Sequence, residues 1–370
     1  MTIDFTQSFA LDYAGARAKF RATAAELGGT LCEYLHPTQK GPDGEDLAID
    51  VARLGDAAAP SQLIVISGTH GLEGLSGSAA QIGWMKSASV RALPARVSVL
   101  LVHAINPYGF AWGTRTTENN VDLNRNFVDH DAPHPVNPGY ATLYPHLVPD
   151  DWTPSALEAY ASSLDRLRAE HGDDALFDVQ ARGQYDFQQG NNFGGRAREW
   201  SNLTLERIVA DHIGEADRVG FIDWHTGIGG WSESFFLCFN DEGGSLHAEA
   251  ARWWGKERIV GQRPHNMARP NYQGLVFHGM TEFLRGRPMV GAVVEFGTRG
   301  VDVRRALQLD LWLKFKGERD SERVRLLKAD LHDCFVPVSA VWRERTTEQA
   351  ISITQQAIDG LATWSLAAAA

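Results

Sequence analysis

The chain contains 370 residues, of which 44% are hydrophobic, so it is long enough and apolar enough for one large α/β domain or two ordinary ones. Lys and Arg total 35 while Asp and Glu total 46, which gives a net charge of −11. A chain with this charge is repelled by nucleic acid and by anionic membrane surfaces, so we expect neither as a partner.

Apolar runs of β-type residues alternate with helical stretches along the chain, which is the pattern of an α/β sheet covered by helices on both faces. Strands are predicted at residues 63–67, 97–105, 218–224, 235–239 and 289–296. Helices are predicted at residues 9–27, 76–85, 155–171, 203–213, 246–256, 304–316 and 347–362. We expect one domain over residues 1–370, with a single mixed, mostly parallel, twisted sheet.

Two segments show neither the strand pattern nor the helix pattern of apolar residues and are predicted to be loops. Residues 128–150 contain five prolines, and residues 189–195, "QGNNFGG", form a glycine-rich connection. Either segment could form the rim of a binding site.

The cysteines and the first residues bear on the cellular compartment. Cys32, Cys238 and Cys334 are far apart and form no C-x-x-C pair, which argues against a disulfide framework and a thiolate zinc site. The first 20 residues contain no basic segment followed by an apolar core. No uncharged apolar run approaches the roughly 20 residues that a membrane span needs. We therefore expect a cytoplasmic protein without a signal peptide.

Potential metal ligands stand at the ends of three predicted strands. His70 and Glu73 follow the first strand in "ISGTHGLEG". His225 ends a second strand in "DWHTG", and Glu295 ends a third in "VVEFG". The carboxyl ends of strands in open α/β sheets meet where ligands bind, and two histidines with one carboxylate are a common ligand set of catalytic zinc. H-x-x-E also arises by chance in a chain with 13 histidines, so a hydrogen-bonded turn is the alternative.

Five motifs in a fixed order resemble a known enzyme family. "HGLE", then "NPYG" (106–109), then "VDLNRNF" (121–127) precede the strand-end histidine and the strand-end glutamate. This order is similar to that of the zinc carboxypeptidases of the carboxypeptidase A clan. The passage "RGQYDFQQGNNFGGRAREWSNLTLERIV" resembles a branch of that clan known mainly as a domain of unknown function. The resemblance covers about residues 63–299 and implies a carboxypeptidase A-like (phosphorylase/hydrolase-like) fold.

The resemblance also implies roles for the matching residues. His70, Glu73 and His225 match the ligands of one zinc ion, and Glu295 matches the general base that passes a proton to the leaving amine. Asp122 matches the carboxylate that holds the first histidine.

Three further matches concern the substrate. Asn124 and Arg125 match the pair that grips a free carboxylate, and Arg115 is the match for the arginine that polarises the scissile carbonyl. Arginine suits the first task because its planar fork pairs with a carboxylate through two hydrogen bonds.

Two further candidate site residues are proposed only from their positions in the sequence. Asp223 lies two residues before His225, on the same face of the strand, and could orient that imidazole; a salt bridge or a turn contact would place it there equally well. Tyr272 lies 23 residues before Glu295 and is a candidate for the tyrosine that closes over substrate in the family, although a core tyrosine fits the spacing too.

The reaction class stays open between two hydrolases. The main expectation is a zinc-dependent hydrolase that cleaves the amide bond of a small peptide or acyl amino acid with a free carboxylate. The "DWHTG" motif is closer to the usage of aspartoacylase and succinylglutamate desuccinylase-type deacylases, so an N-acyl amino acid deacylase or esterase is the alternative. A non-catalytic metal-binding relative is a third possibility, against which the carboxylate of Glu295 argues. Other divalent transition metals fit the same ligands, and the oligomeric state leaves no mark in the sequence.

Overall fold

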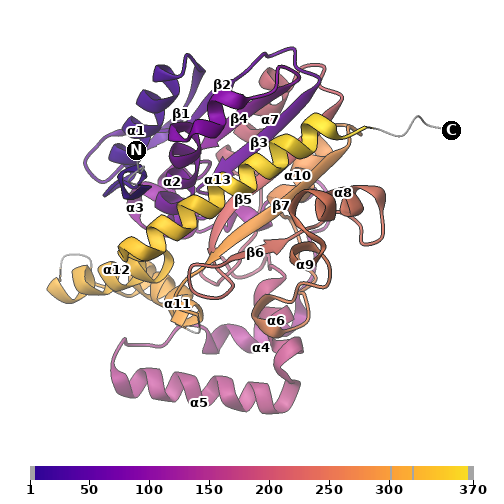
Figure 1. Cartoon of the computed structure of the whole chain (residues 1–370). Coiled ribbons are helices and arrows are strands. Elements are labelled where there is room, and N and C mark those ends of the chain that lie inside the picture. The colour runs from indigo at the N-terminus through magenta and orange to yellow at the C-terminus, as the bar shows by residue number, and fades with distance from the viewer. Residues whose placement is uncertain (1–4, 301, 319–320, 366–370) are drawn as a thin grey trace.

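A single mixed sheet runs through the computed structural model, which describes residues 5–300, 302–318 and 321–365 (Figure 1). Seven strands within these residues are arranged in the order β1-β2-β4-β3-β5-β7-β6. They are β1 (Thr30–Lys40), β2 (Asp46–Leu54), β3 (Ser61–Ser67), β4 (Val97–His103), β5 (Arg218–Gly227), β6 (Ser234–Leu237) and β7 (Met289–Gly297). The predicted α/β class with one mixed sheet is confirmed.

Only three of the six strand pairings in the described residues are parallel, so the sheet is mixed as predicted but not mostly parallel: the strands that extend it on both sides, which are less continuously apolar, pair antiparallel. Strands β4, β3, β5 and β7 pair parallel with one another, whereas β2 pairs antiparallel with β4, β1 with β2, and β6 with β7. Every residue of the four central strands is buried, which explains why their sequences are nearly continuous apolar runs. The carboxyl ends of β3, β5 and β7 therefore lie side by side.

Thirteen α-helices occur in the described residues. They are α1 (Tyr13–Glu26), α2 (Gly74–Lys86), α3 (Pro107–Trp112), α4 (Pro138–Leu143), α5 (Pro154–His171), α6 (Asp173–Ala181), α7 (Trp200–His212), α8 (Ser245–Trp254), α9 (Lys256–Ile259), α10 (Val276–Phe283), α11 (Asp302–Phe315), α12 (Glu322–Phe335) and α13 (Ala340–Thr363). None of the helices in the described segments is both long enough and apolar enough to cross a membrane.

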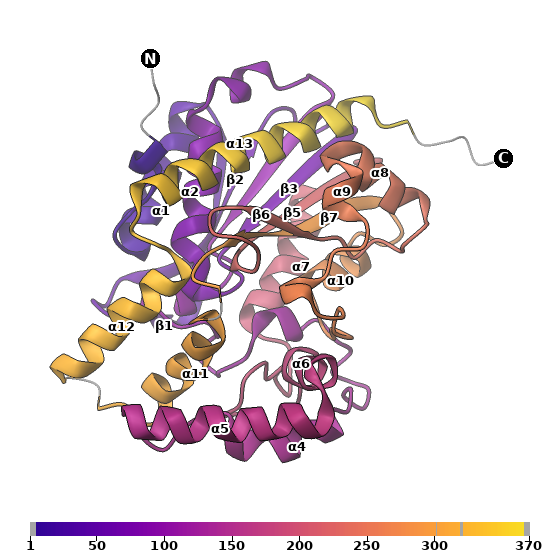
Figure 2. The ribbon, with the colours of Figure 1, turned by 60° about the horizontal axis from the view of Figure 1, so that its bottom comes forward.

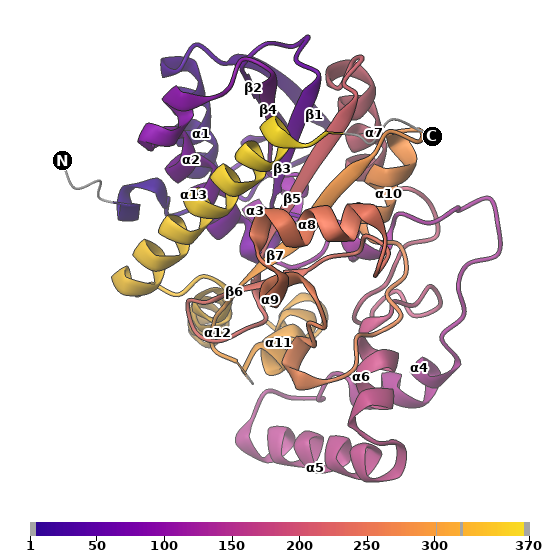
Figure 3. The same cartoon turned by 45° about the vertical axis from the view of Figure 1, so that its right-hand side comes forward.

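Helices cover both faces of the sheet, and Figure 3 shows α1, α2 and α13 on one side of the strands and α7 and α10 on the other. The alternation along β3 reflects this arrangement. Leu63 and Val65 belong to the apolar cluster with α1, α2 and α13, whereas Ile64 and Ile66 belong to the cluster with α7 and α10. Two hydrophobic cores thus share one sheet.

A separate helical layer lies beyond the sheet, formed by α4, α5 and α6 with α11 beside them (Figure 2). The prediction of a loop over residues 128–150 is wrong in part, because this segment contains α4 and a 3-10 turn at Tyr144–His146. Tyr140 and Leu143 of α4 pack in a small apolar cluster with Leu164 of α5 and Leu176 of α6. Contacts with distant helices, rather than local periodicity, stabilise this short helix.

Strands β1 and β2 are absent from the prediction because charged residues interrupt their apolar pattern. Asp50 of β2 is fully buried, and its carboxylate is paired with Arg17 (Nε to Oδ2, 2.7 Å) and with Arg21, both from α1. A buried carboxylate is tolerated only with such partners, and they are distant in the sequence.

Candidate metal centre

The turn after β3 carries His70 and Glu73 into the interior. Gly68 adopts a left-handed conformation (φ +74°), and the chain then forms the short 3-10 turn Gly71–Glu73 before α2 begins. A Cβ on Gly71 would lie 1.9 Å from the carbonyl carbon of Gly109, and the N–H of Gly71 donates to the carbonyl of Arg115 (3.0 Å). This close approach explains why "HGLE" and "NPYG" occur together: the two segments pack backbone against backbone.

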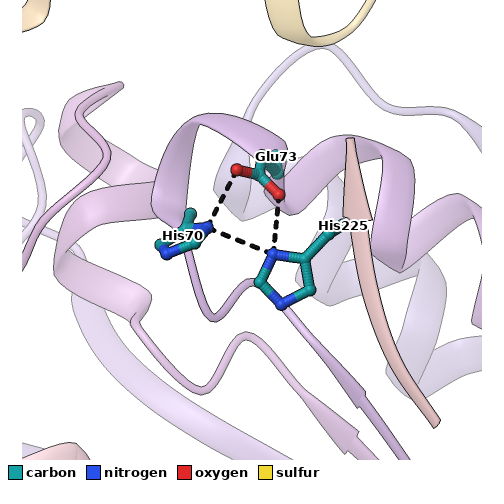
Figure 4. Close-up of side chains that lie close together, drawn as sticks. All are labelled: His70, Glu73 and His225. Atoms are coloured by element: carbon teal, nitrogen blue, oxygen red, sulfur yellow. Dashed lines mark hydrogen bonds and ion pairs between the residues drawn. The ribbon is translucent and has the colours of Figure 1, made fainter. Parts of the chain in front are cut away.

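Three side chains from two strand ends converge at this turn (Figure 4). The Nδ1 atom of His70 lies 2.9 Å from Oε1 of Glu73, and Nδ1 of His225 lies 3.0 Å from Oε2 of the same carboxylate. The two Nδ1 atoms are 3.1 Å apart. All three residues are at most 5% exposed, and one ligand atom from each lies within 4.8 Å of the others. The site can therefore hold one metal ion.

Each imidazole is held at its far nitrogen by a carboxylate. Nε2 of His70 lies 3.0 Å from Oδ1 of Asp122, and Nε2 of His225 lies 2.9 Å from Oδ2 of Asp223. A carboxylate only accepts hydrogen bonds, so each Nε2 carries the proton and, in the neutral tautomer, each Nδ1 presents a lone pair. Two lone pairs 3.1 Å apart repel unless a cation lies near both. Two imidazole nitrogens and a carboxylate oxygen are ligands that Zn²⁺ accepts, and carboxylates behind the histidines are typical of zinc sites, so the residues fit this metal.

Glu295 adds a further buried carboxylate. It is the register partner of His225 across β5 and β7, and its Oε2 accepts a hydrogen bond from the N–H of Ile228 (3.3 Å). Burial, and then the negative charge of Glu73, raise the pKa of Glu295 to about 7. A carboxyl group with this pKa can both take up and release a proton near neutral pH.

Arg115 lies against the carboxylate of Glu73. Its Nη1 is 3.3 Å from Oε1 of Glu73, and its Nη2 is 3.2 Å from Oδ2 of Asp122. The Arg115 backbone is fixed by Asp310 of α11, whose Oδ2 accepts hydrogen bonds from the Arg115 N–H (3.1 Å) and from the Thr114 hydroxyl (3.0 Å).

Arg125 is a buried cation that forms no ion pair among the described residues. Its guanidinium donates to backbone carbonyls instead: Nε to Ala181 (3.0 Å), Nη2 to Ala181 (2.6 Å) and Nη1 to Asn124 (2.5 Å). These bonds use three of its five N–H groups. The guanidinium carbon lies 5.1 Å from the centre of the Tyr272 ring. Arg125 thus braces the chain and still has two N–H groups to offer.

One cavity of about 130 Å³ brings the predicted residues together. The residues proposed from the sequence that line it are His70, Glu73, Arg115, Asn124, Arg125, His225, Tyr272 and Glu295. Asp122 and Asp223 lie behind the histidines and do not line it. Asn124 lines the cavity, where its Oδ1 accepts a hydrogen bond from the N–H of Val276 (2.8 Å), and this bond fixes the orientation of its amide.

Sequence reasoning missed two residues that support the site. The Thr69 hydroxyl donates to Oδ1 of Asp223 (2.8 Å) and so fixes the carboxylate that holds His225. Its position next to His70 could have indicated this role. Nothing in the sequence indicates the role of Asp310, because it lies in a helix 195 residues away from the Arg115 backbone that it anchors.

Comparison with known proteins gives one family and several solved structures. A family described as "Protein of unknown function (DUF2817)" matches residues 9–349. No curated protein matches the chain.

The chain is similar to a metallo-carboxypeptidase from Burkholderia cenocepacia, with 14% identity, 93% of this chain and 68% of that chain covered, and a TM-score of 0.46. A metallo-carboxypeptidase from Pseudomonas aeruginosa in complex with (2-guanidinoethylmercapto)succinic acid gives 13% identity, coverage of 93% and 68%, and a TM-score of 0.47. Bovine thrombin-activatable fibrinolysis inhibitor in complex with tick carboxypeptidase inhibitor gives 10% identity, coverage of 96% and 97%, and a TM-score of 0.49.

Proposed function

The chain belongs to the DUF2817 family of proteins of unknown function, and we propose that it is a metal-dependent hydrolase that cleaves an amide bond in a small substrate with a free carboxylate. One observation carries the proposal: two imidazole Nδ1 atoms and the Glu73 carboxylate converge beside Glu295, while Asp122 and Asp223 hold the opposite ring nitrogens.

Zinc is the metal that we propose for this site. His70, Glu73 and His225 would hold it, and the three ligands leave a position open to solvent or substrate. A zinc ion bound in this way supplies Lewis acidity and lowers the pKa of a coordinated water to about 7.

Glu295 is proposed as the base that takes a proton from water. The proton would move to a carboxylate oxygen of Glu295 as the water oxygen attacks the carbonyl carbon, and would then pass to the amine nitrogen as the C–N bond breaks. The pKa of about 7 suits this exchange, because the group is then neither a very weak base nor a very weak acid at neutral pH. Arg115, whose charge lies at the edge of the same cavity, would polarise the scissile carbonyl.

Arg125 and Asn124 are proposed to bind the free carboxylate of the substrate. A buried guanidinium without an anionic partner is unfavourable, and a carboxylate in the cavity would neutralise it through the two N–H groups that the backbone carbonyls leave free. Tyr272, which lines the same cavity, would pack over the bound group.

Metal analysis combined with a substrate panel tests this function. Purified protein should contain about one zinc per chain, and His225→Ala should contain far less; undiminished metal in the variant would refute the ligand assignment. The parent should hydrolyse members of a panel of dipeptides, acyl amino acids and esters. Bound metal without any hydrolysis would instead favour a non-catalytic metal-binding relative.

A further inference from the structure

A second, larger cavity adjoins the metal cavity. Its volume is about 680 Å³, and its walls come mainly from α5, α6 and α11, which lie together at the bottom of Figure 2. We call it the vestibule. The residues that line both cavities are Phe177, Ala181, Asn192, His265, Val303 and Leu307. Because six residues are shared, a molecule in one cavity contacts the wall of the other.

The two volumes divide the space available to a substrate. The metal cavity, at about 130 Å³, is smaller than the roughly 300–1,000 Å³ of ordinary ligand pockets and is close in size to cavities that hold one benzene-sized group. The vestibule falls within the range of ordinary pockets. A substrate whose reacting part fills the inner cavity must therefore place its remaining part in the vestibule.

Arg304 lines the vestibule next to a residue that the two cavities share. Its guanidinium carbon is 6.0 Å from the centre of the Phe177 ring, and Phe177 is one of the shared residues. The ring of His265, also shared, lies 5.8 Å from that of Phe177. Arg304 is partly buried and, among the side chains that the structure describes, forms no ion pair or hydrogen bond.

The other charged groups of the vestibule are already paired or exposed. Nη1 of Arg168 lies 2.9 Å from Oδ1 of Asp165, and its Nε lies 3.7 Å from Oδ1 of Asp173. Arg305 faces solvent. The two aspartates are thus engaged by Arg168. Asp173 attracts Arg304 only from beyond ion-pair distance, and the charge of Arg168 opposes that attraction, so Arg304 has no direct anionic partner among the described residues.

A buried amide lies one helical turn further along the same wall. Gln308 is 5% exposed, and its Oε1 has no hydrogen-bond partner among the described residues. Residues four apart on a helix share a face, so Gln308 and Arg304 both line the vestibule. Buried polar groups are nearly always hydrogen-bonded, and an amide oxygen accepts hydrogen bonds, so Oε1 of Gln308 is placed to receive an N–H group of a peptide bound beside Arg304.

We propose that the vestibule binds the acyl part of the substrate and selects an acyl part that carries its own carboxylate. Arg304 holds this carboxylate, Oε1 of Gln308 accepts a hydrogen bond from an N–H group of the acyl part, and Phe177 forms an apolar wall. This inference rests on the proposed function and narrows its substrate class to acidic peptides or acidic acyl amino acids with two carboxylates, one on each side of the cleaved bond. Arg304 is suited to this task because a guanidinium binds a carboxylate through two parallel hydrogen bonds.

The experiment compares an acetylated tripeptide that has glutamate at its central position with the same peptide that has glutamine there. The two differ only in charge, so the ratio of their kcat/KM values measures the subsite. The parent should prefer the glutamate peptide by about 10-fold or more, the size of one charge-assisted hydrogen bond. Arg304→Met should bring the ratio close to 1 by slowing only the glutamate peptide, and Arg304→Lys should retain part of the preference.

Arg166→Met is the matched control. Arg166 is an exposed arginine of α5 that does not line the vestibule, so its loss removes the same charge nearby and should leave the ratio unchanged. A parent ratio near 1, or an equal loss on both peptides in Arg304→Met, would overturn the proposal.

A binding measurement separates this inference from the reaction itself. Calorimetric titration of both peptides into Glu295→Gln should show tighter binding of the glutamate peptide, and the further change Arg304→Met should remove the difference. If the parent cleaves neither peptide but this binding difference holds, the proposed function fails and the subsite stands. Equal binding of both peptides would refute the proposed carboxylate subsite, whether or not the enzyme hydrolyses other substrates.

Discussion

Asp122 and His70 are joined by a hydrogen bond of 3.0 Å between Oδ1 and Nε2, although 52 residues separate them in the chain. The bond sets the tautomer of the imidazole and turns its Nδ1 toward Glu73 and His225. The same carboxylate also receives Arg115 at Oδ2 (3.2 Å), so one buried aspartate orients a proposed metal ligand and a proposed catalytic arginine.

Asp122→Asn is therefore expected to weaken metal binding by about 10-fold to 100-fold, because the amide can no longer fix a protonated Nε2 as a carboxylate does. Competition with a chromogenic chelator measures the Kd for zinc. Asp359→Asn, at an exposed position of α13, is the control and should behave like the parent. An unchanged Kd in Asp122→Asn would show that the carboxylate does not tune the site.

Glu295→Gln should lower kcat by about 10²-fold to 10⁴-fold while metal content and thermal stability stay close to those of the parent, because the amide fills the same space but cannot accept a proton. Steady-state kinetics on the best substrate of the panel, with zinc determined in the same samples, gives both quantities. Glu282→Gln changes an exposed glutamate of α10 and serves as the control. Near-parent turnover in Glu295→Gln would place the proton transfer elsewhere.

Arg125→Ala tests whether this arginine binds substrate or only braces the chain. If it binds a terminal carboxylate, capping that carboxylate as an amide should cost the parent about 2 to 5 kcal/mol, or about 30-fold to several thousand-fold in kcat/KM. In Arg125→Ala, kcat/KM for the free acid should fall by a comparable factor, whereas kcat/KM for the amide should stay close to the low value of the parent.

Arg125 also donates hydrogen bonds to the carbonyls of Asn124 and Ala181, and these bonds brace the chain whether or not substrate is bound. If bracing is its whole contribution, the substitution will slow both substrates equally. That result would reject the carboxylate clamp and favour a deacylase that recognises its substrate from the acyl side.

His103 makes the stability of the fold sensitive to acid. It is fully buried in β4, where Nε2 contacts the Ser78 hydroxyl (2.9 Å) and Nδ1 has no partner among the described residues. Burial, and then the charge of Arg17, lower the pKa of His103 from 6.5 to about 3. Between these values the unfolded chain binds a proton that the folded chain does not, so the stability contributed by neutral His103 is present above pH 6.5 and is lost as the pH falls toward 3.

Lowering the pH from 7.5 to 5.5 should therefore reduce the free energy of unfolding by about 1 kcal/mol more in the parent than in His103→Gln. The glutamine side chain at position 103 does not titrate, so the variant lacks this contribution. Urea unfolding of both proteins at the two pH values measures this difference, with a chelator present so that metal binding does not contribute. An identical pH dependence in the two proteins would mean that His103 is protonated to the same extent in the folded and unfolded states.

The sequence by itself determined the elements whose pattern is local. The central strands were predicted because a strand buried on both faces is a continuous apolar run, and the polar residues that end such runs, His70, His225 and Glu295, mark where the strands emerge. Asp223 could be assigned to the same face as His225 because side chains alternate along a strand.

Only the tertiary structure decided the features that depend on distant partners. Strand β2 contains a buried aspartate whose cations come from α1, and α4 is stabilised by α5 and α6, so neither shows the periodicity of an isolated element. The ambiguity over Arg125 has the same origin, since the carbonyl of Ala181 that engages it lies 56 residues away. The vestibule could not be foreseen, because Arg304 and Phe177 meet only after α6 and α11 pack at the end of the sheet. The spacing of apolar residues in the sequence indicates which face of a helix or strand is buried. Which charged side chains remain unpaired depends on how the helices and strands pack together.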